Sequence, residues 1–103
     1  MPGIKLEQFI FDPFPSADSL FLFEVARGAE YAPVKNASGH GIVDSPDTAR
    51  CALLRLHRGW VEVAGGSVEG PGGAEVAPLL SFAGEGLAGR CAGATFCAGA
   101  EIS

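Results

Sequence analysis

Four consecutive large apolar residues, Leu20-Phe-Leu-Phe23, constrain the fold of this chain more than any other stretch. No polar residue interrupts the run, which predicts a strand covered on both faces, as in a parallel sheet. The chain then reaches a short loop that contains a proline and displays one lysine, Tyr31-Ala-Pro-Val-Lys-Asn36. Because open α/β sheets bind ligands at the carboxyl ends of their strands, we predict that Lys35 faces an anion. From the residues alone, a lysine that is simply solvated is the commoner alternative.

Two further features of the N-terminal region bear on this prediction. Residues 4–11 alternate between apolar and polar side chains up to Phe9-Ile-Phe11, a pattern typical of a strand with one solvated face. Asp12-Pro-Phe-Pro15 ends that strand in a turn or irregular crossing, because prolines so close together cannot lie inside a central strand or a helix. Glu24, at the end of the apolar run, either emerges into water or is placed for a function, and its role stays open.

A long helix is predicted after residue 44. Ser45 can cap free amides, Pro46 suits the first helical position, and Asp47 lies at the positive end of the helix dipole. Apolar residues recur at helical spacing up to Val63, and Gly65-Gly66 supplies the stop. On the opposite face we expect solvated charged residues: Arg50, Arg55, Arg58 and Glu62. His57, near the middle of the helix, is expected to be partly exposed.

The sequence beyond this helix is rich in glycine and alanine. We expect a turn over residues 65–73, a short strand over residues 76–82, and no regular structure after Gly86. Small side chains bury little area, so this tail is expected to contribute little to a core.

Charge and cysteine content narrow the functional classes. With 12 acidic and 7 basic residues the net charge is −5, and nucleic-acid binding is not expected. The three cysteines form no Cys-x-x-Cys pair, no signal peptide is recognisable, and the apolar runs are too short to span a bilayer. We therefore expect free thiols in a cytoplasmic protein that does not associate with membranes.

Sequence motifs for dinucleotide binding, zinc binding and hydrolase activity are either incomplete or not recognisable in the sequence. Gly84-Glu-Gly-Leu-Ala-Gly89 matches the dinucleotide pattern G-x-G-x-x-G, but only 14 residues follow it, too few for the helix and second strand that this motif needs. The two histidines and three cysteines lack zinc spacing. No nucleophile has the turn that would mark a hydrolase.

Several unlike blocks, in the same order, resemble the C-terminal part of eukaryotic UDP-N-acetylhexosamine pyrophosphorylase, with the closer likeness to its "like" paralogue. The blocks are Ile4–Asp12, Phe23–Val25, Pro33–Asn36, Asp44–Arg50, Ala52-Leu53, Trp60 with Ala64–Gly66, and Pro78–Leu87. The last block follows the one before it after fewer residues than in the family pattern, as if a β-hairpin segment between them were mostly deleted. The likeness covers roughly four fifths of the chain.

The resemblance implies a uridylyltransferase that joins UTP to an N-acetylhexosamine 1-phosphate, yielding the UDP-sugar and pyrophosphate with Mg²⁺. Phe9 and Phe11 match an aromatic pair that walls the sugar and N-acetyl pocket. Lys35 matches a lysine that faces the nucleotide phosphates and is the candidate catalytic residue. Aromatic rings stack on sugar C–H faces, and a lysine offers a compact charge to phosphate oxygens. The Mg²⁺ ligands are expected outside this chain.

The implied fold class is α/β, an incomplete piece of a nucleotide-diphospho-sugar transferase fold (GT-A-like, Rossmann-like) with one long helix. Residues 1–66 would belong to the catalytic domain, and residues 67–103 would form a truncated C-terminal β segment and irregular tail. The family's nucleotide loop is not present, and the sequence after Leu87 departs from the family pattern. We therefore expect an inactive fragment with exposed edges that permit self-association. The alternative is a non-catalytic interaction module.

Overall fold

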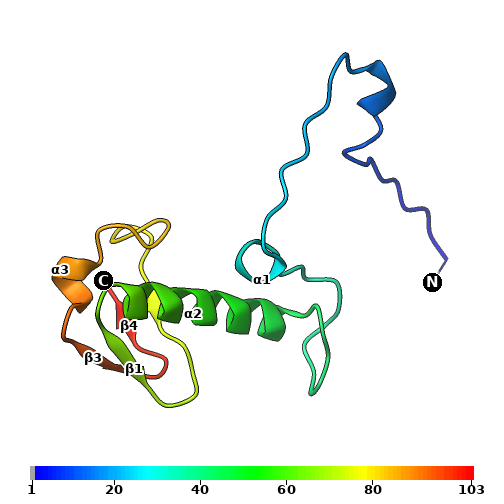
Figure 1. Ribbon diagram of the computed structural model, residues 1–103. Coiled ribbons are helices and arrows are strands. Elements are labelled where there is room, and N and C mark those ends of the chain that lie inside the picture. The colour runs from blue at the N-terminus through cyan, green and yellow to red at the C-terminus, as the bar shows by residue number, and fades with distance from the viewer. Residues whose placement is uncertain (1) are drawn as a thin grey trace.

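The computed structural model describes residues 2–103, which form an extended N-terminal arm (residues 2–44) and a folded C-terminal module (residues 45–103) (Figure 1). Every buried side chain among the described residues lies in the module, between Ser45 and Ile102. The radius of gyration of the Cα atoms is 18.4 Å. A compact domain of this length would have about 13 Å. The difference arises because the arm extends away from the module.

The arm contains two short helices, η1 (Phe14–Ser16) and α1 (Arg27–Glu30), and within residues 2–44 it contains no strand. The predicted turn is confirmed, because residues 10–13 turn and lead into η1. The two predicted strands, over residues 4–11 and 20–23, are wrong for this chain. Phe21, Leu22 and Phe23 are 94%, 100% and 91% exposed. A strand needs a neighbour for its backbone hydrogen bonds, and the described chain supplies none here.

The long helix is confirmed as α2 (Pro46–Val63). The Ser45 side chain accepts a hydrogen bond from the Thr48 N–H, and the Thr48 hydroxyl accepts one from the Ser45 N–H, so a capping box fixes the first turn. Beyond the helix, Gly65 has a φ of +89°, a conformation that glycine adopts without a Cβ clash, and the chain reverses there.

Four short strands follow, and they pair in parallel as two stacked rungs. The first rung (residues 65–77) contains β1 (Ser67–Glu69) and β2 (Glu75–Val76), and the second rung (residues 93–102) contains β3 (Thr95–Cys97) and β4 (Glu101–Ile102). β1 pairs with β3 and β2 with β4, in registers that place Val68 beside Phe96 and Val76 beside Ile102. The helix α3 (Ala88–Cys91) lies between the rungs in sequence. The class is therefore mixed α/β with short parallel strands.

The Gly/Ala-rich tail forms most of the core, contrary to the sequence-based expectation. Only one of the seven buried apolar residues belongs to α2; they are Val61, Val68, Ala74, Val76, Leu87, Cys91 and Ile102. The expected plain turn over residues 65–73 contains β1, and the expected strand over residues 76–82 ends at Val76. Small residues permit this packing because they let backbones approach. A Cβ on Gly66 would lie 2.7 Å from the Cys91 carbonyl oxygen.

Helix α2 covers the outer backbone edge of the first rung. The Arg58 guanidinium donates hydrogen bonds to the carbonyl oxygens of Val68, Gly70 and Gly72, at 3.0, 2.7 and 2.7 Å. His57 Nδ1 accepts a hydrogen bond of 3.0 Å from the Val76 N–H. Arg58 is thus not a solvated arginine, and His57 is buried rather than partly exposed, because both pair with strand backbone that the sequence pattern did not reveal.

Candidate functional site

The structure brings Phe9 and Phe11 together on the arm. Their rings stack with centroids 5.2 Å apart and planes within 5° of parallel. Asp12 organises this turn, because its carboxylate accepts a hydrogen bond from the Phe9 N–H and its own N–H donates to the Phe9 carbonyl. The two rings are 50% and 56% exposed, so each has surface available to a ligand.

An open hollow of about 480 Å³ lies beside this turn, lined by Gln8, Phe9, Ile10, Asp12 and Pro13. Aromatic surface next to a carboxylate and an amide suits the C–H face and hydroxyl groups of a sugar. The chemistry of these residues is therefore compatible with the predicted sugar-binding role, which stays a prediction.

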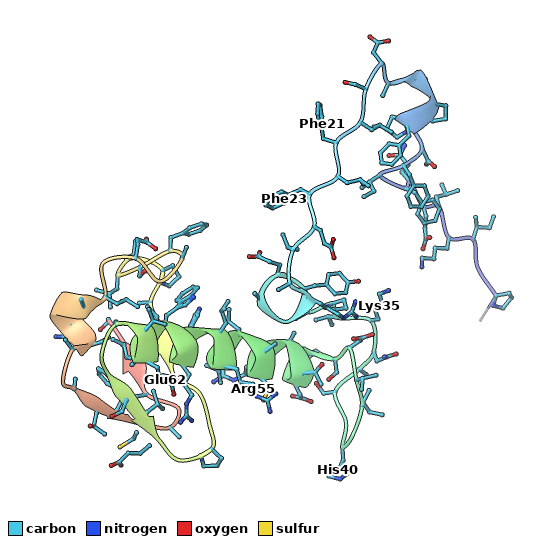
Figure 2. The ribbon with its side chains drawn as sticks, in the orientation of Figure 1. Phe21, Phe23, Lys35, His40, Arg55 and Glu62 are labelled. Carbon is cyan, nitrogen blue, oxygen red and sulfur yellow. The ribbon has the colours of Figure 1, made fainter. Side chains whose placement is uncertain are left out.

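Lys35 lies on a different part of the arm, beside the start of α2 (Figure 2). Its N–H and that of Asn36 both donate to the Asp44 carbonyl, at 2.6 and 2.9 Å. The Asn36 side chain also donates to the Val43 carbonyl, at 2.9 Å. These bonds close the loop between Asn36 and Val43 and tie the lysine backbone to the N-terminus of the helix.

The structure does not bring Lys35 into the hollow beside Phe9 and Phe11. Residues 19–25 separate the two groups. They run as an extended segment in Figure 1 and form no backbone hydrogen bond within the described chain. Glu24 belongs to that segment and is exposed. One pocket built from all three predicted residues therefore requires the arm to fold onto further structure, and this grouping stays a prediction.

Two ionisable residues of the module have shifted pKa values that sequence reasoning missed. The Glu85 carboxylate accepts hydrogen bonds from the N–H groups of Phe82 and Ala83 and from the Ser81 hydroxyl, and these lower its pKa to about 2. Burial lowers the pKa of His57, and the nearby Glu75 carboxylate opposes this shift. Gly84-Glu-Gly86, the start of the G-x-G-x-x-G match, is thus part of a turn that is closed by the hydrogen bonds of Glu85.

These shifts have structural rather than catalytic causes. Glu85 serves its own turn, and His57 stacks on Trp60 with ring centroids 4.5 Å apart while accepting the Val76 N–H. No sequence signal around His57 distinguishes it from an exposed residue, because its partner, the Val76 N–H, lies 19 residues away. The partners of Glu85 are local, within four residues of it.

Metal ligands and membrane spans can be assessed for the residues that the structure describes. Within residues 2–103, no group of three or more His, Cys, Asp or Glu side chains could hold a metal ion. Over the same range, no helix combines the length and the apolar character needed to cross a bilayer. All three cysteines, Cys51, Cys91 and Cys97, are free thiols.

Comparison with known proteins identifies relatives over almost the whole chain. No protein-family model matches it. It is 54% identical over 106 residues to UDP-N-acetylglucosamine diphosphorylase 2 of Arabidopsis thaliana, a match that covers 98% of this chain and 21% of the relative. A probable UDP-N-acetylglucosamine pyrophosphorylase of Dictyostelium discoideum is 37% identical over 103 residues, again covering 98% of the chain and 21% of the relative.

The human UDP-N-acetylhexosamine pyrophosphorylase-like protein 1 is 39% identical and covers 82% of the chain and 20% of the relative. The predicted likeness to the "like" proteins is therefore present, although the Arabidopsis protein matches at higher identity. The expectation that the tail after Leu87 departs from the family is wrong for the Arabidopsis relative, whose match covers 98% of the chain. The chain is therefore similar to UDP-N-acetylglucosamine and UDP-N-acetylhexosamine pyrophosphorylases over a segment that makes up about one fifth of their length.

Proposed function

We propose that the chain contributes part of the active site of a uridylyltransferase. The whole enzyme would join UTP to an N-acetylhexosamine 1-phosphate and release pyrophosphate, leaving the UDP-sugar. The observation that carries this proposal is the 54% identity to a protein named UDP-N-acetylglucosamine diphosphorylase, over 98% of this chain. Because the chain spans 21% of that relative, we expect it to be inactive alone.

The arm would supply the sugar-binding residues. Phe9 and Phe11 are stacked and about half exposed, and aromatic faces of this kind bind the C–H surface of a sugar ring and an acetyl methyl group. Asp12 would hold this pair in place through its hydrogen bonds with Phe9. The preference between the two hexosamine epimers would depend on residues beyond this pair.

Lys35 would neutralise phosphate charge. In nucleotidyl transfer the sugar phosphate oxygen attacks the α-phosphorus of UTP, and the bond to the departing pyrophosphate breaks. Negative charge on the phosphate oxygens is then stabilised by fixed cations, and an ammonium group is a compact donor for this purpose. The hydrogen bonds of Lys35 and Asn36 to Asp44 would restrict where this ammonium can reach.

The described residues do not fit a Mg²⁺ site, because residues 2–103 contain no cluster of three candidate ligands. The proposal therefore assigns any divalent ion to the remainder of the enzyme and no step to it here. Because the chain spans 21% of the relative, we also assign the nucleotide loop and the rest of a GT-A-like sheet to the part of the relatives that this chain does not span.

A titration of the ¹⁵N-labelled chain with UDP-N-acetylglucosamine tests the proposal. We expect only weak binding, because the ligand has to draw the arm together before it can contact both the Phe9 and Phe11 rings and Lys35. Amide shifts at these three residues should disappear in Lys35→Ala. Lys5→Ala is the matched control, because Lys5 is also an arm lysine but is paired with Glu7. Unchanged binding in Lys35→Ala would remove Lys35 from the site.

The exposed arm favours one alternative function, that of a non-catalytic interaction module. Such a module would bind a partner protein through the arm and show no affinity for UDP-sugars. The same titration separates the two, since only the first proposal expects shifts at Phe9 and Lys35.

A further inference from the structure

We propose that Asn36 is a positioning residue for Lys35. Its side-chain amide fixes the loop that carries the lysine, and so determines where the ammonium group meets the phosphate oxygens of a ligand. This inference rests on the proposed function for the ligand of Lys35. It adds a residue that acts on that ligand through the lysine and does not contact the ligand itself.

The ammonium group of Lys35 is available to a ligand. Lys35 is exposed, and the ion pairs within residues 2–103 involve the other cations Lys5 and Arg58. A lysine carries its charge on a flexible four-carbon stem, so the charge samples a large volume. The backbone position from which the stem starts therefore decides how much of that volume lies near a bound phosphate.

Apolar packing does not hold this backbone in place. The loop over residues 36–44 contains no buried side chain. Val34 and Val43, which flank the lysine in sequence and close the loop, are 58% and 68% exposed. The position of Lys35 therefore depends on hydrogen bonds rather than on core contacts.

Two adjacent carbonyl groups at the end of the loop accept these hydrogen bonds. The Asp44 carbonyl accepts from the N–H groups of Lys35 and Asn36, at 2.6 and 2.9 Å. The Val43 carbonyl accepts from the side-chain amide of Asn36, at 2.9 Å. Asn36 thus donates two of the three bonds, and one of these two comes from its side chain.

The side-chain bond supplies a constraint that the backbone bonds lack. Both backbone donors share the single oxygen of Asp44, so the loop can pivot about that oxygen. The bond from Asn36 to Val43 adds a second point of attachment and removes this freedom. Because Asp44 directly precedes the buried Ser45 cap of α2, the orientation of the helix is passed on to the lysine.

The donor group of Asn36 can be removed or retained by substitution. Alanine has no donor, whereas glutamine keeps the amide N–H₂ group and adds one methylene. Neither change alters the charge near the ligand, so any effect reports on the hydrogen bond. Ser38→Ala is the matched control, at an exposed position of the same loop.

NMR of the ¹⁵N-labelled chain tests the inference, first without ligand and then in a titration with UDP-N-acetylglucosamine. In Asn36→Ala we expect a lower heteronuclear NOE at the Lys35 amide and unchanged values along α2. The ligand must then order the lysine itself, so its affinity should fall by about three- to tenfold. Asn36→Gln should restore most of both properties, and Ser38→Ala should match the unsubstituted chain.

Three outcomes would overturn the inference. They are an unchanged NOE and affinity in Asn36→Ala, a loss of order that extends equally along α2, and no restoration by Asn36→Gln. The second outcome would assign Asn36 a merely structural role, because a positioning residue affects the lysine selectively.

The two stages of the experiment also separate this inference from the proposed function. Selective loss of order at Lys35 in Asn36→Ala, in a chain that shows no shifts with UDP-N-acetylglucosamine, supports the positioning role and contradicts the proposed function. Binding that is lost in Lys35→Ala but unaffected by Asn36→Ala supports the proposed function and contradicts the positioning role.

Discussion

The N–H of Lys35 donates a hydrogen bond to the Asp44 carbonyl oxygen, 2.6 Å away, immediately before the Ser45 cap of α2. The helix start therefore holds the one lysine that we assign to phosphate binding. Asp44 itself has a φ of +50°, which is uncommon for a residue other than glycine and marks a sharply defined turn. The position of Lys35 thus depends on the cap.

Ser45→Ala tests this dependence. Ser45 is fully buried, and its hydroxyl bonds the Ile42 carbonyl and accepts the Thr48 N–H. We expect a loss of about 1 kcal/mol in the free energy of unfolding, together with broadened amide signals at Lys35 and Asn36. Thermal melts and NMR spectra provide the measurements. Ser38→Ala, at an exposed serine in the adjoining loop, is the control, and equal effects of the two substitutions would contradict the prediction.

Acidification should destabilise the module through His57. Its folded pKa lies below the ordinary value of 6.5, so the unfolded state binds more protons as the pH falls through that value. Stability should therefore be at its full value above about pH 6.5 and decrease as the pH falls toward the folded pKa. Urea unfolding at a series of pH values measures this slope.

His57→Gln should remove the histidine component of that slope, since a glutamine oxygen can still accept the Val76 N–H. His40→Gln, at an exposed histidine of the arm, should leave it unchanged. A slope that persists in His57→Gln would assign the pH dependence to another group.

Arg58→Lys should destabilise the module by about 1–3 kcal/mol, because a lysine cannot reproduce three carbonyl hydrogen bonds and the bond to Glu62 from one planar group. Arg55→Lys, on an exposed position of the same helix, should change stability by less than about 0.5 kcal/mol. Chemical denaturation of both variants makes the comparison. Similar losses of stability in the two variants would mean that the hydrogen bonds from Arg58 to the carbonyl oxygens do not stabilise the module.

Two glycine substitutions should change the free energy of unfolding in opposite directions. A Cβ on Gly73 would overlap the Leu54 carbonyl of α2, so Gly73→Ala should destabilise by about 1–3 kcal/mol. A Cβ on Gly59, inside α2, would meet no atom within 4 Å, so Gly59→Ala should stabilise by roughly 0.5–1 kcal/mol. Melting temperatures suffice to read both signs, and a stabilising Gly73→Ala would refute the close approach of the first rung to the helix.

The sequence predicted the elements whose determinants are local. The start of α2 depends on Ser45, Pro46 and Thr48, which lie within one helical turn, and its end depends on Gly65. The module was missed because its rungs bring only a few apolar side chains each, such as Val68 and Ile102, from segments far apart in sequence. Neither rung is long enough to show a period of its own.

The candidate site was predicted only as a set of residues. Phe9 and Phe11 come together because they are two positions apart and share one turn. Their relation to Lys35 depends on residues 18–25, which form no backbone hydrogen bond within residues 2–103. The buried run at Leu20–Phe23 was predicted from hydrophobicity alone. Burial of that run would need a neighbouring sheet, and the two-stranded sheets within residues 2–103 do not pair with it.

The cover that α2 places over the first rung also limits polymerisation. Parallel rungs with free edges on both sides can add strands indefinitely and grow into fibres. In this chain Arg58 bonds the Val68 carbonyl of β1 and His57 accepts the Val76 N–H of β2, so α2 hinders the addition of a further strand to the outer side of the first rung.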